Sequence, residues 1–295
     1  SKSLNLKEGD RCLNIMPLFH IHGLLAGLIA SFSVGATVIV TDGFTALNFF
    51  ETLQRFKPTW YTAVPTMHKM ILKRIKKTKT NIQNNCLKFI RSSSAPLGEK
   101  TIKEIEAVFK VPVIEAYGMT EATHQITTNT NKLNGKKIGS VGKINIPSVR
   151  IINNAGNFLP KNKIGEIVIK GDTVTNGYLN NEKANSDSFY KNWFRTGDLG
   201  LIDSDDFLWI KGRIKELINR GGEKISPFEV DSVISSHPEV ENVVTFALPH
   251  QLLFEEVAVA VVVDKGSILT ESNLINFCKE KLSKHKIPTK VYFAS

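Results

Sequence analysis

Residues 115–124 place an aromatic ring, a hydroxyl and a carboxylate directly after a short apolar run at residues 111–114. The run is typical of a buried strand, and Tyr117, Thr120 and Glu121 follow it within a few positions. In open α/β sheets, ligands bind beyond the carboxyl ends of the strands. A threonine hydroxyl can donate to a phosphate oxygen, and a carboxylate can hold Mg²⁺, which prefers oxygen ligands. Taken alone, this segment fits nucleotide chemistry and an ordinary helix cap about equally well.

The composition is that of a globular protein with room for a large and a small domain. The chain has 295 residues, of which 42% are hydrophobic and 22% charged. Its three cysteines, Cys12, Cys86 and Cys278, have no paired spacing. That pattern argues against a disulfide framework or a zinc site and favours a reducing compartment. We therefore expect an intracellular protein, and we leave open whether it lies in the cytoplasm or the peroxisome.

The chain carries a formal net charge of +10, with its densest basic cluster at residues 73–79. The cluster contains no interleaved aromatic residue and no nucleic-acid motif, so it is interpreted as the solvated end of a helix. We expect no nucleic-acid partner. A modest positive field would still attract ATP and acidic substrates.

Residues 23–41 contain no charge, which raises the question of a membrane span. Ser31, Ser33, Gly35 and Thr37 interrupt the segment, and its pattern changes from helical to β-branched. This change predicts a buried helix that leads into a buried strand, and no membrane span. The chain begins without a signal-peptide pattern and ends without a peroxisomal Ser-Lys-Leu, so we expect both ends to be truncated.

The pattern of elements predicts an α/β fold. Between residues 36 and 116, short apolar runs alternate with helical patterns, which indicates a parallel sheet with crossover helices. The runs are residues 37–40, 60–64, 87–92 and 111–116. Residues 140–211 favour strands and turns, including strands at 149–152 and 165–170, which predicts a small antiparallel, barrel-like unit. A capping box with proline at the first helical position is expected to open a helix at Ser226-Pro227-Phe228-Glu229. A small α/β domain would follow, giving domains at 1–214 and 215–295.

Four segments occur in the order and spacing of one enzyme superfamily. They are residues 17–23, 115–124, 193–198 and 212–218. Together they resemble the adenylate-forming superfamily over nearly the whole chain, and in particular the acyl-CoA synthetases. Residues 60–66, 121–124 and 218–227 are most similar to the oxalate–CoA ligase, or peroxisomal-type CoA synthetase, branch.

The resemblance implies a nucleotide site for ATP and AMP. Tyr117 would pack on adenine, Thr120 would donate to the α-phosphate, and Glu121 would hold Mg²⁺. Asp198 would accept from the ribose hydroxyls and Arg213 would donate to the same sugar; alone, each would be taken for a turn or surface residue. The implied nucleotide-binding set is Ser94, Ala95, Tyr117, Gly118, Thr120, Asp198 and Arg213, and the implied catalytic set is His20, Thr120 and Glu121.

The histidines are assigned by the same resemblance. His20 and His22 lie two residues apart, but no third ligand is evident nearby, so a metal is not expected there. The resemblance implies that His20 gates the path between nucleotide and thiol, while His22, Ser93 and His124 line the acyl pocket. Buried donors are costly unless something pairs with them, and a short dicarboxylate such as oxalate would do so. The alternative is that protein groups satisfy both histidines.

The resemblance further implies a carboxylate–CoA ligase with a small domain that swings about a hinge at Lys215. Gly221, Gly222 and Lys224 would lie at the channel for coenzyme A. The superfamily's phosphate loop and adenylation lysine are missing from this sequence, so the chain alone is expected to be nearly inactive. We also expect a monomer. A ligase for another small or aromatic acid and a non-catalytic nucleotide-binding protein remain open.

Overall fold

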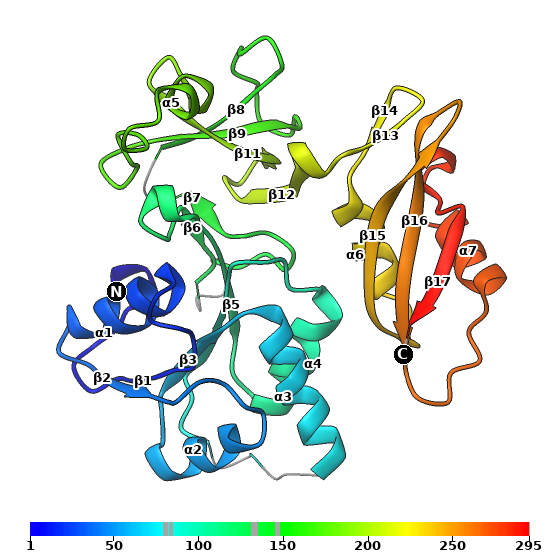
Figure 1. Cartoon of the computed structure of the whole chain (residues 1–295). Coiled ribbons are helices and arrows are strands. Elements are labelled where there is room, and N and C mark those ends of the chain that lie inside the picture. Colours follow the sequence, from blue (N-terminus) through cyan, green and yellow to red (C-terminus); the bar gives the residue numbers. More distant parts are fainter. Residues whose placement is uncertain (79–81, 83–84, 131–134, 145–147, 295) are drawn as a thin grey trace.

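The computed structural model describes residues 1–78, 82, 85–130, 135–144 and 148–294. Three β-sheets follow one another along the chain, each with its own core (Figure 1). Lys79, the last residue of the predicted basic cluster, lies outside the described residues. Among the described residues, no helix has the length and apolar character needed to cross a lipid bilayer.

The first sheet contains the predicted parallel strands. Its order is β2-β1-β3-β4-β5-β6-β7, and β1 to β5 are parallel, whereas β6 and β7 pair antiparallel with the edge. The seven strands are β1 (Arg11–Asn14), β2 (Thr37–Val40), β3 (Trp60–Ala63), β4 (Phe89–Ser92), β5 (Val113–Tyr117), β6 (Thr127–Thr128) and β7 (Lys143–Ile144). The chain reverses its direction across the sheet between β1 and β3, which is where open α/β sheets bind ligands.

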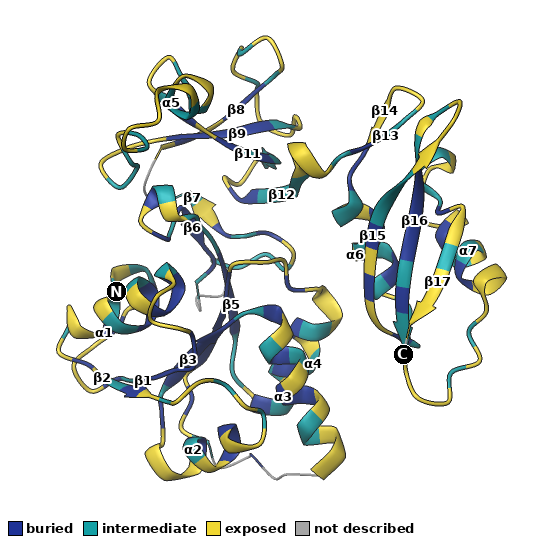
Figure 2. Ribbon diagram, in the orientation of Figure 1, coloured by how far each residue is buried: buried dark blue, intermediate teal, exposed yellow. Residues whose placement is uncertain are grey.

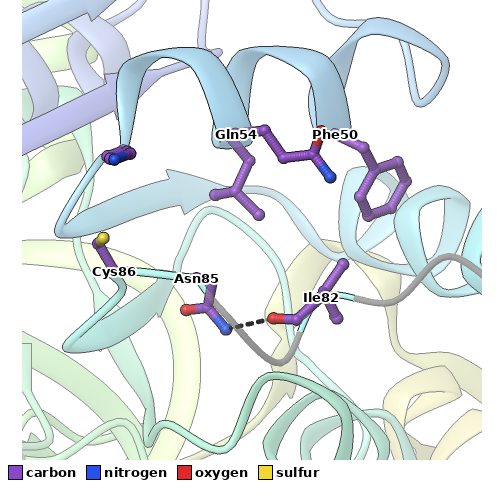
Figure 3. A pocket seen from close by; sticks show the side chains of 7 residues that line it. Phe50, Gln54, Ile82, Asn85 and Cys86 are labelled. Atoms are coloured by element: carbon purple, nitrogen blue, oxygen red, sulfur yellow. Dashed lines mark hydrogen bonds between the residues drawn. The ribbon is translucent and has the colours of Figure 1, made fainter.

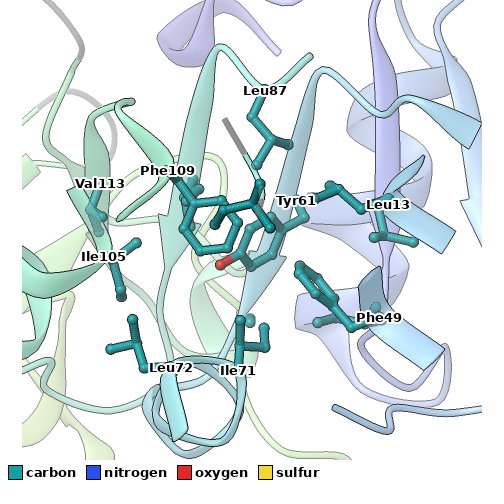
Figure 4. Packing of buried hydrophobic residues seen from close by; sticks show 14 of the residues in the cluster. Leu13, Phe49, Tyr61, Ile71, Leu72, Leu87, Ile105, Phe109 and Val113 are labelled. Atoms are coloured by element: carbon teal, nitrogen blue, oxygen red, sulfur yellow. The ribbon is translucent and has the colours of Figure 1, made fainter. Parts of the chain in front are cut away.

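Helices cover both faces of this sheet. The largest core cluster joins one face to α2 (Asn48–Phe56), α3 (Pro65–Thr78) and α4 (Glu99–Phe109), with Tyr61 near its centre (Figure 4). On the other face, Trp60 and Phe89 pack with η1 (Lys2–Leu4) and α1 (Ala30–Phe32). Because successive strand residues point to opposite faces, each central strand is buried on both sides (Figure 2).

The second sheet is the predicted antiparallel unit. Its order is β10-β11-β9-β8, and β12 pairs with β11. Its elements are β8 (Ser148–Ile152), β9 (Gly165–Lys170), α5 (Glu182–Ser188), β10 (Phe189–Tyr190), β11 (Trp193–Ile202) and β12 (Leu208–Arg213). A β-bridge between Lys143 and Phe207 joins it to the first sheet.

The third sheet belongs to a small α/β unit that follows η4 (Ile214–Glu216). Its order is β14-β13-β16-β15, and β17 runs parallel to β16. Its elements are β13 (Ile218–Arg220), β14 (Glu223–Ile225), α6 (Pro227–Ser235), β15 (Val240–His250), β16 (Phe254–Val263), α7 (Glu271–Lys279), η5 (Lys284–Lys286) and β17 (Lys290–Ala294). Helices α6 and α7 pack on the sheet through an apolar core of their own.

Two local predictions were wrong in detail. Helix α6 begins after Ser226 with proline at its first position, but the Ser226 hydroxyl makes no cap bond and instead donates to the carbonyl of Lys211 at 2.6 Å. The capping box is therefore not formed. Residues 23–41 do fold as a helix and a strand, but β2 is an edge strand in which only Ile39 is fully buried. An edge strand lacks a neighbour on one side, which is why it is more exposed than predicted.

Candidate functional site

Four strands of the first sheet send polar side chains to one place at their carboxyl ends. The segment after β1 leads to His22, Thr62 lies in β3, Ser94 follows β4, and His124 follows β5 and the short helix η3 (Thr120–Ala122). His22 is fully buried and begins η2 (His22–Ile29), a π-helix with hydrogen bonds from residue i to i−5. Such π-helical turns are rare and are often found at functional sites.

Both ring nitrogens of His22 have partners. Nδ1 lies 3.0 Å from Oγ of Ser94, and Nε2 lies 2.6 Å from Oγ1 of Thr62. Nη1 of Arg91 also approaches Nε2, at 3.4 Å. The imidazole is thus held from three directions by protein groups.

His124 stacks on His22, with ring centroids 5.2 Å apart. Nε2 of His124 is buried and has no partner among the described residues, whereas the Ser93 hydroxyl donates to the carbonyl of Ala116 at 2.8 Å. Burial, and after it the charge of Arg91, lowers the pKa of His22 and of His124 to about 2. Both imidazoles are therefore neutral at physiological pH.

The backbone around this histidine pair is strained. Ser94 has φ 74° and His124 has φ 76°, a left-handed conformation that residues other than glycine rarely adopt. Strain of this kind concentrates at functional sites. Gly118 explains how the turn can close, since a Cβ at Gly118 would lie 1.2 Å from the carbonyl oxygen of His124.

Arg91 lies behind the histidines and is 1% exposed. Nη1 also lies 3.4 Å from Oγ1 of Thr62, while Nε and Nη2 have no hydrogen-bond partner among the described residues. No carboxylate of those residues forms an ion pair with it. Burial lowers the pKa of Arg91 to about 10, so the guanidinium remains charged at neutral pH.

A second cluster links the end of β5 to the second sheet. The hydroxyl of Tyr117 donates to Oδ2 of Asp198 at 2.6 Å, and Nε of Arg213 donates to Oδ1 at 2.8 Å. Asp198 and Arg213 are direct cross-strand partners in β11 and β12. Burial, and then the charge of Asp198, raises the pKa of Tyr117, so the phenol stays protonated. Asp198 keeps further lone pairs, because each carboxylate oxygen can accept more than one hydrogen bond.

Thr120 and Glu121 lie together in η3, between these two clusters along the chain. The Glu121 carboxylate accepts a hydrogen bond from the hydroxyl of Tyr178 at 2.8 Å, and its backbone carbonyl accepts from Thr175 at 2.7 Å. Thr120 is exposed. A half-exposed carboxylate with free lone pairs can serve as one oxygen ligand of Mg²⁺, and phosphates and water would supply the remaining ligands.

The remaining site residues predicted from the sequence are exposed. Ser94 and Ala95 follow β4 at the surface, and His20 is exposed with Nδ1 accepting from the backbone N–H of His22 at 3.1 Å. Lys215 lies in η4, between the second and third sheets. Gly221 and Gly222 form the tight turn between β13 and β14, and Lys224 is exposed in β14.

Among the predicted nucleotide and acyl residues, hydrogen bonds join His22 to Ser94 and join Tyr117 and Arg213 to Asp198, while His124 stacks on His22. Three further residues that make side-chain contacts here were missed by the sequence analysis. These are Thr62, Arg91 and Tyr178. Thr62 and Arg91 fell inside predicted strands, where polar residues were not weighed. Arg91 had one usable signal, because a charged residue inside the buried strand pattern of residues 87–92 calls for a reason.

The hollow in Figure 3 is a different place. It is lined by α2 and by residues that precede β4, including Phe50, Gln54, Asn85 and Cys86. These residues lie at the amino-terminal edge of the strands, opposite to the histidine pair. Another hollow lies beside Thr41 and Asn48. Neither hollow contains a residue of the two clusters.

Two families of known proteins match the chain. The family described as AMP-binding enzyme matches residues 1–179, and the family described as AMP-binding enzyme C-terminal domain matches residues 229–295. The chain is 44% identical over 290 residues to an oxalate–CoA ligase of Arabidopsis thaliana, covering 97% of this chain and 56% of that protein. It is also 44% identical over 286 residues to an oxalate–CoA ligase of Saccharomyces cerevisiae, covering 96% of this chain and 52% of that protein.

Among solved structures, ATP-bound MatB from Rhodopseudomonas palustris superimposes with a TM-score of 0.89 at 29% identity, covering 99% of this chain and 58% of that one. The chain thus spans little more than half the length of the proteins it matches. Both family patterns, the sequence relatives and the shared fold lead to one assignment. This chain belongs to the family of AMP-binding enzymes.

Proposed function

We propose that this chain carries the nucleotide and acyl sites of an ATP- and CoA-dependent carboxylate ligase that prefers oxalate. In that reaction a carboxylate oxygen attacks the α-phosphate of ATP and pyrophosphate leaves. The CoA thiol then attacks the acyl-adenylate carbonyl, and AMP leaves. The observation that carries the proposal is that Tyr117, which bonds to Asp198 of the second sheet, and the His22–His124 pair both lie at the carboxyl ends of the parallel strands.

The nucleotide is proposed to bind beside Tyr117, with adenine against its ring and against the backbone of Gly118, Ser94 and Ala95. Exposed small residues after β4 leave room for the base. Asp198 and Arg213 would hold the ribose, because their cross-strand pairing fixes an acceptor and a donor side by side. Their existing hydrogen bond orients both groups before the nucleotide arrives.

Phosphate chemistry is proposed for Thr120 and Glu121. Thr120 is exposed at the start of η3 and can donate to the α-phosphate. Glu121 would hold Mg²⁺, which offsets the phosphate charge. The Tyr178 hydroxyl fixes the carboxylate without occupying all its lone pairs. Preorganised charge compensation of this kind is usually the largest single contribution to such a reaction.

The acyl pocket is proposed to lie at His124, with His22 and Ser93 behind it. Both nitrogens of His22 already have protein partners and the Ser93 hydroxyl donates to the backbone, so these two position the pocket. Nε2 of His124 has no partner among the described residues, which leaves it for the far carboxylate of oxalate. The names of the Arabidopsis and yeast relatives favour the same acid.

The second half-reaction is proposed to use rotation of the unit after Lys215. Gly221 and Gly222 both have positive φ and form a narrow two-residue turn, and Lys224 follows it. Without side chains, this turn could pass close to the pantetheine arm of CoA. His20 would gate the path between the two halves of the site.

Pyrophosphate release by the full-length protein tests the proposal. We would compare oxalate, other small and aromatic acids, and acetate, at saturating ATP, Mg²⁺ and CoA. His124→Ala should lower the oxalate-to-acetate ratio of kcat/KM by about 30-fold, because a buried carboxylate loses its donor. An unchanged ratio, with both rates falling together, would assign His124 to the nucleotide or the fold. If pyrophosphate is released with a different acid and not with oxalate, that acid replaces oxalate as the proposed substrate. If none of the acids supports release, the ligase assignment is wrong.

The setting of the protein is a further proposal. The unpaired spacing of the three cysteines supports a reducing compartment, so we place the protein in the cytoplasm or the peroxisome. We also propose a monomer. Sedimentation of the purified full-length protein and localisation of a tagged copy would test these two statements.

A further inference from the structure

Arg91 is a buried cation without an acidic partner among the described residues. It lies on β4, and two of its three guanidinium nitrogens have no hydrogen-bond partner there. A buried charge destabilises the fold unless an opposite charge or hydrogen bonds compensate it. A buried guanidinium without an acidic partner is therefore expected to have a functional role or to pair with a bound anion. Its one contacting nitrogen, Nη1, faces Nε2 of His22 and Oγ1 of Thr62.

The contacts of Arg91 decide where the proton of His22 lies. A guanidinium nitrogen can only donate, so the Nε2 that faces it must accept. Thr62 can then accept from Arg91 and donate its own proton to Nε2, at 2.6 Å. The proton of the neutral ring must therefore be on Nδ1, which donates to Oγ of Ser94 at 3.0 Å. Ser94 accepts this bond and keeps its hydroxyl proton for the exposed side.

The charge of Arg91 also reaches the acyl pocket. Nη1 lies 3.4 Å from Nε2 of His22, and the ring of His124 stacks on that of His22 with centroids 5.2 Å apart. In keeping with this proximity, burial and then the guanidinium charge lower the pKa of both imidazoles. The rings themselves are neutral, so among the residues of this cluster Arg91 is the cation. A positive charge in a poorly hydrated site favours an anion over a neutral group.

We propose that Arg91 is a positioning and specificity residue of the acyl site: it fixes His22 as the Nδ1–H tautomer and favours acids with a second anionic group. This inference rests on the proposed ligase function for its substrate, but the tautomer does not depend on turnover. The class of ligand is a short acid with two negative charges, of which oxalate is one.

The tautomer is tested by imidazole ¹⁵N chemical shifts of the full-length protein labelled at histidine. Wild type should show His22 protonated on Nδ1, and Arg91→Met should show mixed tautomers. Thr62→Val, which keeps the guanidinium, should still show Nδ1–H. A His22 signal unchanged in Arg91→Met, or protonated on Nε2 in wild type, would overturn this part of the inference.

Specificity is tested with the same variants and two acids. Arg91→Met should lower the oxalate-to-acetate ratio of kcat/KM by about tenfold or more, and Arg91→Lys, which keeps the charge, should stay within about threefold of wild type. Lys88→Met is the matched control, because it removes an exposed charge from the same segment, where Lys88 pairs with Asp10. It should leave the ratio unchanged.

The two failures are distinguishable. If none of the acids supports pyrophosphate release by the wild-type protein, the ligase proposal fails. The ¹⁵N shifts still test whether Arg91 fixes the tautomer of His22. If wild type prefers oxalate and Arg91→Met keeps the wild-type ratio, Arg91 serves the fold alone. Arg91→Lys decides the case should Arg91→Met not fold: a ratio as low as that of His124→Ala would contradict a role for the charge.

Discussion

Glu121 is held by a residue far along the chain. Tyr178 donates to its carboxylate from the segment between the second sheet's β9 and α5, 57 positions away. Sequence reasoning can propose Glu121 from its neighbours, but the Tyr178 partner depends on how the second sheet lies against η3. Substitution of Tyr178 would change the orientation of the Glu121 carboxylate and keep its charge. The contributions of charge and orientation can therefore be measured separately.

We predict that Glu121→Gln lowers pyrophosphate release by the full-length protein by about 10²-fold, because the proposed Mg²⁺ ligand loses its charge. Tyr178→Phe should lower it by only about fivefold, the scale of one neutral hydrogen bond. The measurement is kcat at saturating Mg²⁺. Equal losses in the two variants would mean that Glu121 acts through the Tyr178 contact and not as a metal ligand.

Glu115 is a buried carboxyl on β5 with one oxygen, Oε2, that has no partner among the described residues. Burial raises its pKa from the ordinary value of 4.5 to about 8. Between these two values the folded protein holds a proton that the unfolded chain has released. The stability of the fold therefore falls as the pH rises from about 4.5 to 8.

Glu115→Gln should remove this fall, since glutamine does not ionise. We expect its free energy of unfolding to exceed that of wild type by about 2 kcal/mol or more at pH 8, and by less at pH 5. Urea unfolding at the two pH values checks this. Glu99→Gln, at an exposed position on α4, is the control and should leave the difference between pH 5 and pH 8 as in wild type. A pH-independent effect of Glu115→Gln would rule out the titration.

At the scale of elements, the turn after β5 determines whether the histidine pair can form. Gly118 lies at the crossing point of this turn, where its backbone meets the carbonyl of His124. The turn runs through η3 and returns in β6, which pairs antiparallel with β5. A side chain at position 118 would force the two strands of this turn apart.

Gly118→Ala is therefore expected to destabilise the fold by about 2 kcal/mol or more and to separate the rings of His22 and His124. Gly9→Ala is the matched control, because no atom lies within 4 Å of the Cβ it would add, and it should change stability by less than about 0.5 kcal/mol. Denaturant unfolding gives both values. A Gly118→Ala protein as stable as Gly9→Ala would show that the turn has another way to close.

Elements that consist mainly of apolar residues could be predicted from the sequence. Elements and caps that depend on contacts with distant segments could not. The runs at β3, β4, β5 and β9 predicted strands because burial on both faces leaves few polar positions. β1 was missed because Arg11 and Asn14 interrupt its apolar pattern. The Ser226 cap was wrong because its hydroxyl is turned toward β12, where it donates to the carbonyl of Lys211, and no local rule reveals this contact.

The site divides in the same way. Tyr117, Asp198 and Arg213 were proposed through motifs, and the structure joins them by hydrogen bonds. The partners of His22 come from strands β3 and β4, so they depend on sheet order and register. Arg91 lies within a predicted buried strand. The strand pattern indicates that Arg91 is buried, but it does not indicate which groups its guanidinium contacts.

At the scale of the whole molecule, the unit after Lys215 lies against α3 and α4 through exposed polar contacts (Figure 1). Nζ of Lys73 pairs with Glu241 at 2.7 Å, and Nζ of Lys100 donates to the carbonyl of Pro238 at 3.0 Å. Exposed ion pairs contribute about 0–1 kcal/mol, so such contacts can hold one orientation without preventing another.

We predict that Lys73→Glu changes the ratio of thioester formation to adenylate formation by up to about fivefold, because it weakens this orientation by about 1 kcal/mol. The double variant Lys73→Glu with Glu241→Lys should restore the wild-type ratio, since the pair is re-formed with exchanged charges. The two half-reactions are measured separately in the full-length protein. If the double variant does not recover, the pair has no part in setting the orientation.

The convergence of distant segments on His22 has a consequence for folding. Its partners Thr62 and Ser94 lie 40 and 72 residues away in the sequence, so no part of the cluster can form locally. Contacts between distant residues form slowly, because long loops must close before the contacts stabilise them. The resonances of His22 would then acquire their native values only in the last kinetic phase of refolding. A ring at the centre of the site can thus report when the sheet around it is complete.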